Sequence, residues 1–350
     1  MIKKLINTLV AFIAILAITV APAAQACTRI VYEAGDSQIF TGRSMDWMED
    51  VHSSLWAFPK GMERDGGIEP DSIAWVSKYG SIIASVYDIG SGDGINDQGL
   101  VANLLYLAES DYGGLEGKPA LSVGAWAQYA LDNYATVAEA VEALSAEPFR
   151  IVAPPLPNGS PAGVHLSLSD STGDSAIFEY IDGELVIHHG REYDVMTNSP
   201  TYDQQIPINA YWQEIGGLTM LPGTNRAADR FARASYYLHA VPKFEDSRLA
   251  VSTAFSIMRN ASVPLGITDS SQPNIATTIW RVIADQNSHT YYFESAISPN
   301  IFWVKMENLN LQQGGDSMKL DLESHPILAG EVSEMFEPAE PFDWLAPEAS

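Results

Sequence analysis

Cys27 is the residue whose type and position most directly suggest chemistry. It is the only cysteine in the 350-residue sequence, and it directly follows Ala24-Gln25-Ala26. Two lysines precede the apolar run Leu5–Val20, as in a secretory leader, and Ala-x-Ala supplies the small residues that signal peptidase requires. We therefore predict that residues 1–26 are a signal peptide. Its removal would leave a free amine and a thiol on the same residue.

An N-terminal cysteine can act as a nucleophile and base together. An α-amino group has an unperturbed pKa of about 8 and a thiol one of about 8.5, so both lie close to neutral pH. The amine can take the thiol proton, directly or through one water, and the thiolate can then attack an acyl carbon. Such a site also needs a cation near the sulfur, an acid that orients the ammonium, and donors for a tetrahedral oxyanion.

Other interpretations of Cys27 are possible. A lipid anchor is disfavoured because lipidation normally wants leucine three residues before the cysteine and a small residue two before it, where this chain has Ala24 and Gln25. Free cysteines are often inert and buried, yet a solitary thiol in an exported protein is more often functional. The scattered histidines leave a Cys–His dyad open, although no papain-like signature surrounds Cys27.

Composition limits the partners. Removing residues 1–26 deletes two lysines and no acidic residue, so the net charge changes from −25 to −27. This charge disfavours nucleic acids and anionic lipids as partners. No later run of 18 apolar residues follows the leader, so we expect no stable membrane anchor. No CxxC, HExxH, GxSxG or SxxK motif occurs, and we expect no metal and no cofactor.

Patterns of apolar residues predict an α+β fold in which helices cover layered sheets. Residues 59–71 and 154–161 are expected to be loops, and the acidic segment from residue 331 to 350 a draped or mobile tail. Asp88, Asp93, Asn96 and Asp97 miss the EF-hand spacing, so Asp93-Gly94 and the segment from Asn96 to Gly99 are interpreted as turns. The expected strands are 28–32, 38–41, two within 72–87, 100–107, a meander within 163–197, 277–285, 290–294 and 301–306. The expected helices are 121–132, 136–146, 226–239 and 247–259.

Arg43 and Asp46 are the charged residues that the predicted strands bring near Cys27. Positions three apart on a regular strand point to opposite faces. Both side chains can face Cys27 only if the strand ends or bends between them. By spacing alone, they would be an ordinary surface ion pair.

The stretches Cys27-Thr-Arg-Ile30 and Gly42-Arg-Ser-Met-Asp-Trp47 resemble the choloylglycine hydrolase family. This family of N-terminal nucleophile hydrolases contains bile salt hydrolases and penicillin V acylases. Segments 93–100, 196–201 and 229–233 follow the family pattern in the same order. The resemblance implies a four-layer αββα sandwich with two antiparallel sheets, formed by one catalytic domain over residues 27–350, with an acidic tail at 330–350. It also implies a homotetramer.

The resemblance implies a role for each site residue. Cys27 would be the nucleophile and its α-amine the base. Arg43 would lie beside the sulfur and lower the pKa of the thiol, and Asp46 would hold the amine. Trp47 would line an acyl pocket together with Met45, although a buried aromatic with no such role is an equal alternative for Trp47.

The same family pattern supplies the oxyanion donors. The side-chain amide of Asn198 and the backbone N–H of Tyr106 would donate to the oxyanion, and Arg230 would brace the site. Without the resemblance, a turn residue before Ser199-Pro200 would be an equal alternative for Asn198, and the usual interpretations would be a core residue for Tyr106 and a solvated charge for Arg230.

The predicted function is a periplasmic amidohydrolase of the Gram-negative penicillin V acylase-like branch. It would cleave a linear amide with an apolar or aryl acyl group, as in penicillin V or long-chain N-acyl homoserine lactones. Bile salt hydrolases tend to carry Asn where this chain has Tyr106, and a charge of −27 suits a neutral lactone amide better than an anionic bile salt. The alternatives are a bile salt hydrolase and, in another class, a lipid-anchored periplasmic binding protein.

Overall fold

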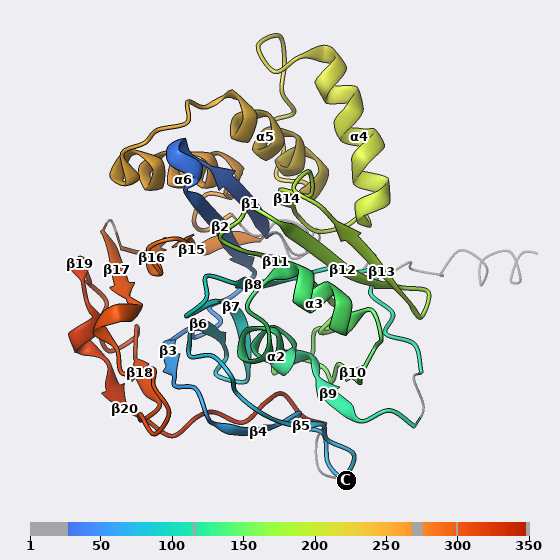
Figure 1. The fold of residues 1–350 in the computed structure, drawn as a ribbon. Coiled ribbons are helices and arrows are strands. Elements are labelled where there is room, and N and C mark those ends of the chain that lie inside the picture. The colour runs from blue at the N-terminus through green and yellow to red at the C-terminus, as the bar shows by residue number, and fades with distance from the viewer. Residues whose placement is uncertain (1–26, 115–116, 268–275, 299, 348–350) are drawn as a thin grey trace, which may run out of the picture.

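Two antiparallel sheets form the centre of the molecule, and helices cover their outer faces (Figure 1). The computed structural model describes residues 27–114, 117–267, 276–298 and 300–347, so the predicted signal peptide, residues 1–26, lies outside the described residues. Helices α5 and α6 lie over the first sheet, α4 packs against α5, and α2 and α3 lie over the second sheet. This arrangement confirms the predicted αββα sandwich.

The first sheet has the strand order β14-β1-β2-β15-β16-β17-β19, and all of its neighbours are antiparallel except β17 and β19. Its strands are β1 (Thr28–Glu33), β2 (Ile39–Trp47), β14 (Val195–Met196), β15 (Thr277–Asp285), β16 (Thr290–Ser295), β17 (Ile301–Lys305) and β19 (Gly330–Glu331). The segment after Cys27 therefore occupies an inner strand next to β2.

The second sheet has the order β13-β12-β11-β8-β7-β6-β3-β18-β20. Its strands are β3 (Leu55–Phe58), β6 (Ser81–Val86), β7 (Gly90–Asn96), β8 (Val101–Tyr106), β11 (Val164–Ser169), β12 (Ser175–Ile181), β13 (Glu184–His189), β18 (Met318–Leu320) and β20 (Glu337–Pro338). Two small sheets pair β4 (Glu63–Asp65) with β5 (Ala74–Val76), and β9 (Ala120–Ser122) with β10 (Arg150–Val152).

Five α-helices within the described residues surround these sheets. They are α2 (Trp126–Asn133), α3 (Val137–Leu144), α4 (Tyr202–Ile215), α5 (Ala227–Ala240) and α6 (Ser247–Ala261), with short 3₁₀ turns at η1 (Gly35–Ser37), η2 (Val123–Ala125), η3 (Met306–Asn308) and η4 (Ser333–Met335). Helix α6 buries Ala250, Ala254 and Met258 at a spacing of four residues, as an amphipathic helix should. A Cβ on Gly42 of β2 would lie 3.0 Å from Met258 Cγ and 2.9 Å from Ile283 Cδ1, so this glycine lets α6 approach the sheet closely.

Several local predictions are confirmed. Thr136 caps α3 by accepting a hydrogen bond from the Glu139 N–H, as its capping-box sequence predicts. The predicted turn at residues 96–99 is present, with Gly99 at φ +82° and the Asn96 side chain accepting from the Leu100 N–H. The first predicted middle helix is shorter than expected, because residues 120–122 form strand β9 and helix α2 begins only at Trp126.

Other local predictions are wrong. Asp93 and Gly94 do not form a turn but lie within the buried strand β7, where a Cβ on Gly94 would meet Ile82 O at 2.6 Å. The predicted loop 59–71 contains β4, and helix α4 was not predicted because Pro207 inside it lacks a helical N–H. The described part of the acidic tail, predicted to be draped or mobile, contributes strands β19 and β20 and a buried Leu345.

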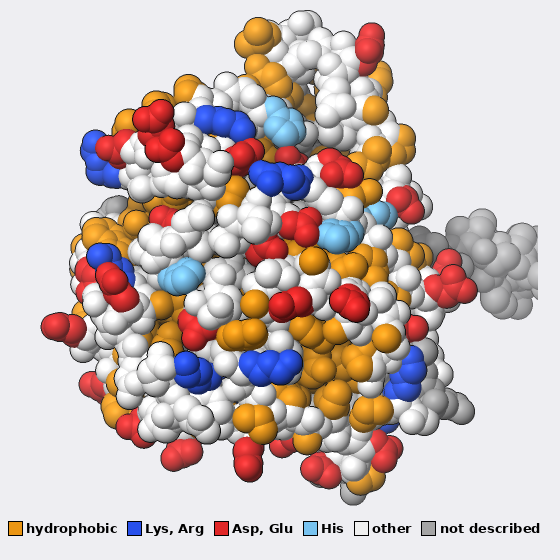
Figure 2. Space-filling model, in the orientation of Figure 1, with side chains coloured by type: hydrophobic (Ala, Val, Ile, Leu, Met, Phe, Trp, Pro, Cys, Tyr) orange, Lys and Arg blue, Asp and Glu red, His pale blue; other side chains and the backbone are white. Residues whose placement is uncertain are grey.

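Charged side chains lie mostly on the outside. Figure 2 shows acidic side chains spread around this face, with fewer lysines and arginines between them. None of the helices in the described ranges is both long and apolar enough to span a bilayer.

Candidate active site

Strand β2 places its charged residues on opposite sides of the first sheet. Thr28 pairs with Ser44, so Cys27 extends toward Met45 on the face that looks at the second sheet. Arg43 shares this face, while Asp46 points toward helix α5. Strand β2 neither ends nor bends between Arg43 and Asp46, so the condition under which both side chains would face Cys27 is not met. The strand runs on to Trp47, and the irregularity lies in β15, which shifts register opposite it.

The sulfur of Cys27 lies beside Arg43. Nη2 of Arg43 is 3.8 Å from Cys27 Sγ and donates to the Leu104 carbonyl at 3.0 Å. The guanidinium carbon lies 4.6 Å from the centre of the Trp280 ring. Nε and Nη1 of Arg43 are buried and find no hydrogen-bond partner among the described residues. A buried cation in this position favours the thiolate form of a cysteine.

The backbone of Cys27, on the side away from the sulfur, forms several hydrogen bonds. Its nitrogen donates to Asn198 Oδ1 at 2.5 Å, and its carbonyl accepts from Arg230 Nη1 at 2.5 Å. Arg230 also donates to Thr28 Oγ1 at 2.6 Å and to Asn198 Oδ1 at 2.7 Å. Burial lowers the pKa of Arg230, and the negative charges of Asp46 and Cys27 oppose that shift. Arg230 therefore holds Cys27 and Asn198 in one fixed arrangement.

Asp46 has one free carboxylate oxygen in this region. Its Oδ1 accepts from Thr278 Oγ1 at 2.6 Å, while Oδ2 lies 4.0 Å from Arg230 Nη1 and has no hydrogen-bond partner among the described residues. Burial raises the pKa of Asp46 to about 6, against the opposing effects of Arg230 and Thr278. In the full-length sequence the nitrogen of Cys27 belongs to a peptide bond; an ammonium there would supply a nearby positive charge.

Tyr106 and Asn198 direct donors toward the same space. At the end of β8, the Leu107 N–H donates to Gly163 O at 3.1 Å, so the N–H and C=O of Tyr106 point to the opposite edge of the strand. The Tyr106 carbonyl accepts from Asn198 Nδ2 at 2.7 Å on that edge. An amide nitrogen has two protons. The second proton of Asn198 Nδ2 and the N–H of Tyr106 can therefore both serve an oxyanion.

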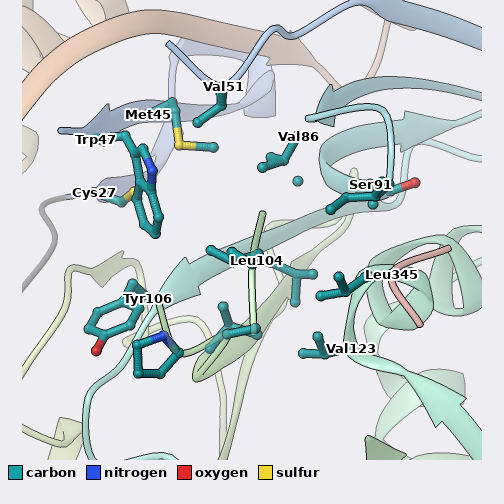
Figure 3. A pocket seen from close by; sticks show the side chains of 18 of the residues that line it. Cys27, Met45, Trp47, Val51, Val86, Ser91, Leu104, Tyr106, Val123 and Leu345 are labelled. Carbon is teal, nitrogen blue, oxygen red and sulfur yellow. The ribbon is translucent and has the colours of Figure 1, made fainter. Parts of the chain in front are cut away.

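A largely apolar cavity opens from the sulfur of Cys27 (Figure 3). Most of the side chains that line it are aliphatic or aromatic, as is usual for a small-molecule site. Trp47 and Tyr106 lie near Cys27, while Val123 and Leu345 lie at the far end. Met45 and Trp47 both line the cavity, as the sequence predicts. The complete lining consists of Cys27, Arg43, Met45, Trp47, Val51, Val86, Ile89, Gly90, Ser91, Gly92, Leu104, Tyr106, Val123, Gly124, Leu156, Pro161, Ala162, Val164 and Leu345.

Sequence analysis missed the pair that supports the Asn198 segment. His165 Nδ1 contacts Glu179 Oε1 at 2.9 Å, and its Nε2 contacts the Thr197 carbonyl at 2.9 Å. Glu179 also accepts from the Tyr202 N–H at 3.0 Å. These hydrogen bonds fix both ends of the segment from Thr197 to Tyr202, which contains Asn198. The signal in the sequence is weak, because His165 and Glu179 meet only across the paired strands β11 and β12.

The charge of Glu179 is strongly favoured in the folded state. Burial alone raises the pKa of Glu179, but the hydrogen bond with His165 and the nearby imidazole of His188, whose Nε2 lies 3.8 Å from Oε2, outweigh it and lower the value to about 2. The pair is a buried support for the segment that carries Asn198.

Comparisons with known proteins agree with this geometry. The model of the choloylglycine hydrolase family, described as linear amide C–N hydrolases, matches residues 27–323. Penicillin V acylase of Pectobacterium atrosepticum is 49% identical over 369 aligned residues, which cover 98% of each chain. A bile salt hydrolase/transferase of Clostridium perfringens is 24% identical over 313 residues, covering 81% of this chain and 94% of that protein.

Solved structures show the same relationship. Penicillin V acylase from Agrobacterium tumefaciens superimposes with a TM-score of 0.86 at 53% identity, covering 92% of this chain and all of that one. A mutant of the conjugated bile acid hydrolase from Clostridium perfringens gives a TM-score of 0.72 at 22% identity, covering 84% and 96% of the two chains. The chain therefore belongs to the choloylglycine hydrolase family and is a linear amide C–N hydrolase of the penicillin V acylase type.

Proposed function

We propose that this enzyme hydrolyses penicillin V and N-acyl homoserine lactones through a thioester on Cys27, which becomes the first residue when the signal peptide is removed in the periplasm. One observation carries the proposal. The sulfur lies at the opening of an apolar cavity, 3.8 Å from a buried guanidinium, while the nitrogen of the same residue lies among polar groups.

In the proposed mechanism, the α-amine of Cys27 takes the thiol proton and the sulfur attacks the amide carbon. Asn198 Nδ2 and the Tyr106 N–H donate to the oxyanion that forms. The intermediate collapses when the leaving amine takes the proton from the Cys27 ammonium, and a thioester remains. The same amine then activates a water that hydrolyses the thioester and releases the acid.

The charged residues have separate tasks in this mechanism. Arg43 stabilises the thiolate before attack, because it faces the sulfur and has no carboxylate at hydrogen-bond distance among the described residues. The free Oδ2 of Asp46 accepts a hydrogen bond from the ammonium. Arg230 holds Asn198 and Cys27 in position through its hydrogen bonds to both. Each task follows from which side of the first sheet the residue occupies.

The cavity favours an apolar acyl group. Most of its lining is aliphatic or aromatic, and the two relatives at about half identity are named penicillin V acylases. Beside Cys27, the rings of Tyr106 and Trp47 contact each other edge-on, with 6.4 Å between their centres. We infer that a flat phenoxyacetyl group or a thin alkyl chain fits beside this aromatic pair better than a steroid nucleus does, so bile salt hydrolysis is the second candidate.

Processing and a substrate panel test the proposal together. We expect the purified protein to begin at Cys27, Cys27→Ala to lose all measurable turnover, and Cys27→Ser to retain little because serine is harder to deprotonate. Release of 6-aminopenicillanic acid and homoserine lactone should exceed release of glycine or taurine from bile salts. Full activity in a protein with a blocked nitrogen at Cys27 would refute the mechanism.

Location and assembly stay predictions. Mass spectrometry of the N-terminus separates a free amine from a diacylglyceryl thioether, which would indicate the lipid-anchored alternative. Light scattering of the processed enzyme tests the homotetramer that the family resemblance implies.

A further inference from the structure

The end of the acyl cavity opposite Cys27 is built partly from the C-terminal segment. Leu345 lies there with Val123 (Figure 3). It is 9% exposed and lies beyond residues 27–323, the part of the chain that the family model matches. The cavity wall therefore contains a side chain from a part of the chain not covered by that model.

Hydrogen bonds on both sides fix the backbone of Leu345. Its N–H donates to the Ile89 carbonyl at 2.8 Å, and its carbonyl accepts from Ser122 Oγ at 2.6 Å. Ile89 lines the cavity itself, and Ser122 directly precedes Val123. Leu345 is thus attached to the cavity wall at two points and is not a loosely draped tail residue.

Aromatic contacts fix the segment just before Leu345. Phe342 packs against the rings of Trp56 and Phe58, with centroids 5.3 and 6.1 Å apart. Trp344 contacts Phe342 edge-on at 5.2 Å and lies under the guanidinium of Arg64 at 5.6 Å. These contacts leave the side chain of Leu345 little freedom to move away from the cavity.

The surrounding wall cannot easily make room for a longer ligand. A Cβ on Gly124 would lie 2.5 Å from the Ile89 carbonyl, and one on Gly90 would lie 2.9 Å from the Cα of Gly124. The backbones of these residues therefore already touch. Ser91, the polar side chain at this end, donates to Gln128 at 2.9 Å and so has a partner for its hydroxyl proton. A ligand that reaches this end of the cavity therefore meets mainly apolar groups.

We infer that Leu345 is the residue that limits the length of the acyl group, so that this enzyme selects its amide substrates by where an aliphatic or arylalkyl chain meets the C-terminal segment. The inference rests on the proposed function, because it requires that the acyl group enter this cavity with its carbonyl at Cys27. Leu345 is a specificity residue that contacts only the distal end of the substrate.

The test compares two variants over a series of chain lengths. Leu345→Ala removes three carbon atoms from the end wall, and Leu345→Phe adds volume there. For N-acyl homoserine lactones from butanoyl to tetradecanoyl, we expect the maximum of kcat/KM to move to longer chains in Leu345→Ala and to shorter chains in Leu345→Phe. Two added methylenes should favour the alanine variant about tenfold relative to wild type.

A matched control and a second readout keep the inference falsifiable. Leu218→Ala alters a leucine that is 96% exposed, and its profile should match wild type. Protection of Cys27 from iodoacetamide by alkanoic acids of increasing length should follow the same order as turnover. An unchanged profile in both folded Leu345 variants, or an equal loss at all chain lengths, would overturn the inference. If wild type cleaves no lactone, that part of the proposed function fails, while the protection series still measures the end wall.

Discussion

The two sides of Cys27 differ in almost every physical respect. On the nitrogen side, Asn198 and Arg230 form short hydrogen bonds to one another and to the backbone of Cys27. On the sulfur side, Arg43 lies next to a cavity whose other walls are mostly apolar. The comparison suggests that the polar side determines the chemistry and the apolar side determines the substrate. Substitutions on the nitrogen side should therefore alter turnover, and substitutions on the sulfur side should alter substrate selectivity.

After the complete loss expected for Cys27→Ala, the largest effect is expected for Asn198→Ala. This change removes the proposed oxyanion donor and the acceptor for both Arg230 Nη2 and the Cys27 nitrogen. Loss of one oxyanion donor typically reduces kcat about 100- to 1,000-fold. We expect that reduction for penicillin V hydrolysis with little change in KM. Asn209→Ala is the control, because Asn209 is also a buried asparagine but lies in helix α4, outside the site. Turnover near the wild-type value in Asn198→Ala would exclude Asn198 from the reaction.

A smaller effect, on the stability of the fold, is expected from Glu179, which supports the segment that carries Asn198. The pKa of Glu179 is about 2 in the folded protein, below its ordinary value of 4.5. Its ionised form therefore stabilises the fold above pH 4.5, and this contribution is lost as the pH falls toward 2. Between pH 5.5 and 3.5 the loss should be about 1 kcal/mol. Glu179→Gln keeps an acceptor for His165 but should lack this pH dependence.

Urea unfolding at the two pH values measures the Glu179 contribution. The difference in unfolding free energy between wild type and Glu179→Gln should shrink as the pH falls. Glu184→Gln changes an exposed acid on the neighbouring strand β13 and serves as the control. A difference that stays constant with pH would show that the ionised form of Glu179 does not stabilise the fold.

The smallest effect is expected on the sulfur side. The Trp47 indole donates to Tyr87 Oη at 3.0 Å, and the Tyr87 hydroxyl donates to Glu49 at 2.5 Å. Tyr87→Phe removes the acceptor that orients the Trp47 ring, a loss of about 1 kcal/mol. We expect KM for penicillin V to rise a few-fold while kcat stays unchanged. Tyr211→Phe, at a tyrosine that is 62% exposed, is the control. A fall in kcat alone would place Trp47 in the chemistry instead.

Sequence patterns predicted the local structure well where one motif specifies it. The cap of α3 by Thr136 and the turn at Gly99 depend on neighbouring residues, so their residue types are sufficient. Asp93 shows the opposite case. Its turn-like sequence lies in a central strand, where Asn103 and Tyr291 donate to its carboxylate at 2.6 Å each. Those partners come from other strands, and no local pattern announces them.

The candidate site divides in the same way. Motif resemblance identified Cys27, Arg43, Asp46, Asn198 and Arg230, and the fold brings them together. It did not identify His165, Glu179 or Leu345. These residues contact the site segment or cavity from other strands and from the C-terminal segment.

By itself, the sequence determined most of the alternation of strands and helices, the family, and Cys27 as the candidate nucleophile. Those features follow from periodicity, local turn chemistry and short motifs, which depend on neighbours along the chain. Tertiary structure alone decided that Arg43 and Asp46 lie on opposite faces of one strand and that Leu345 lines the far end of the cavity. The physical reason is that burial, desolvation and hydrogen-bond partners arise between residues far apart in sequence, once sheets and helices pack.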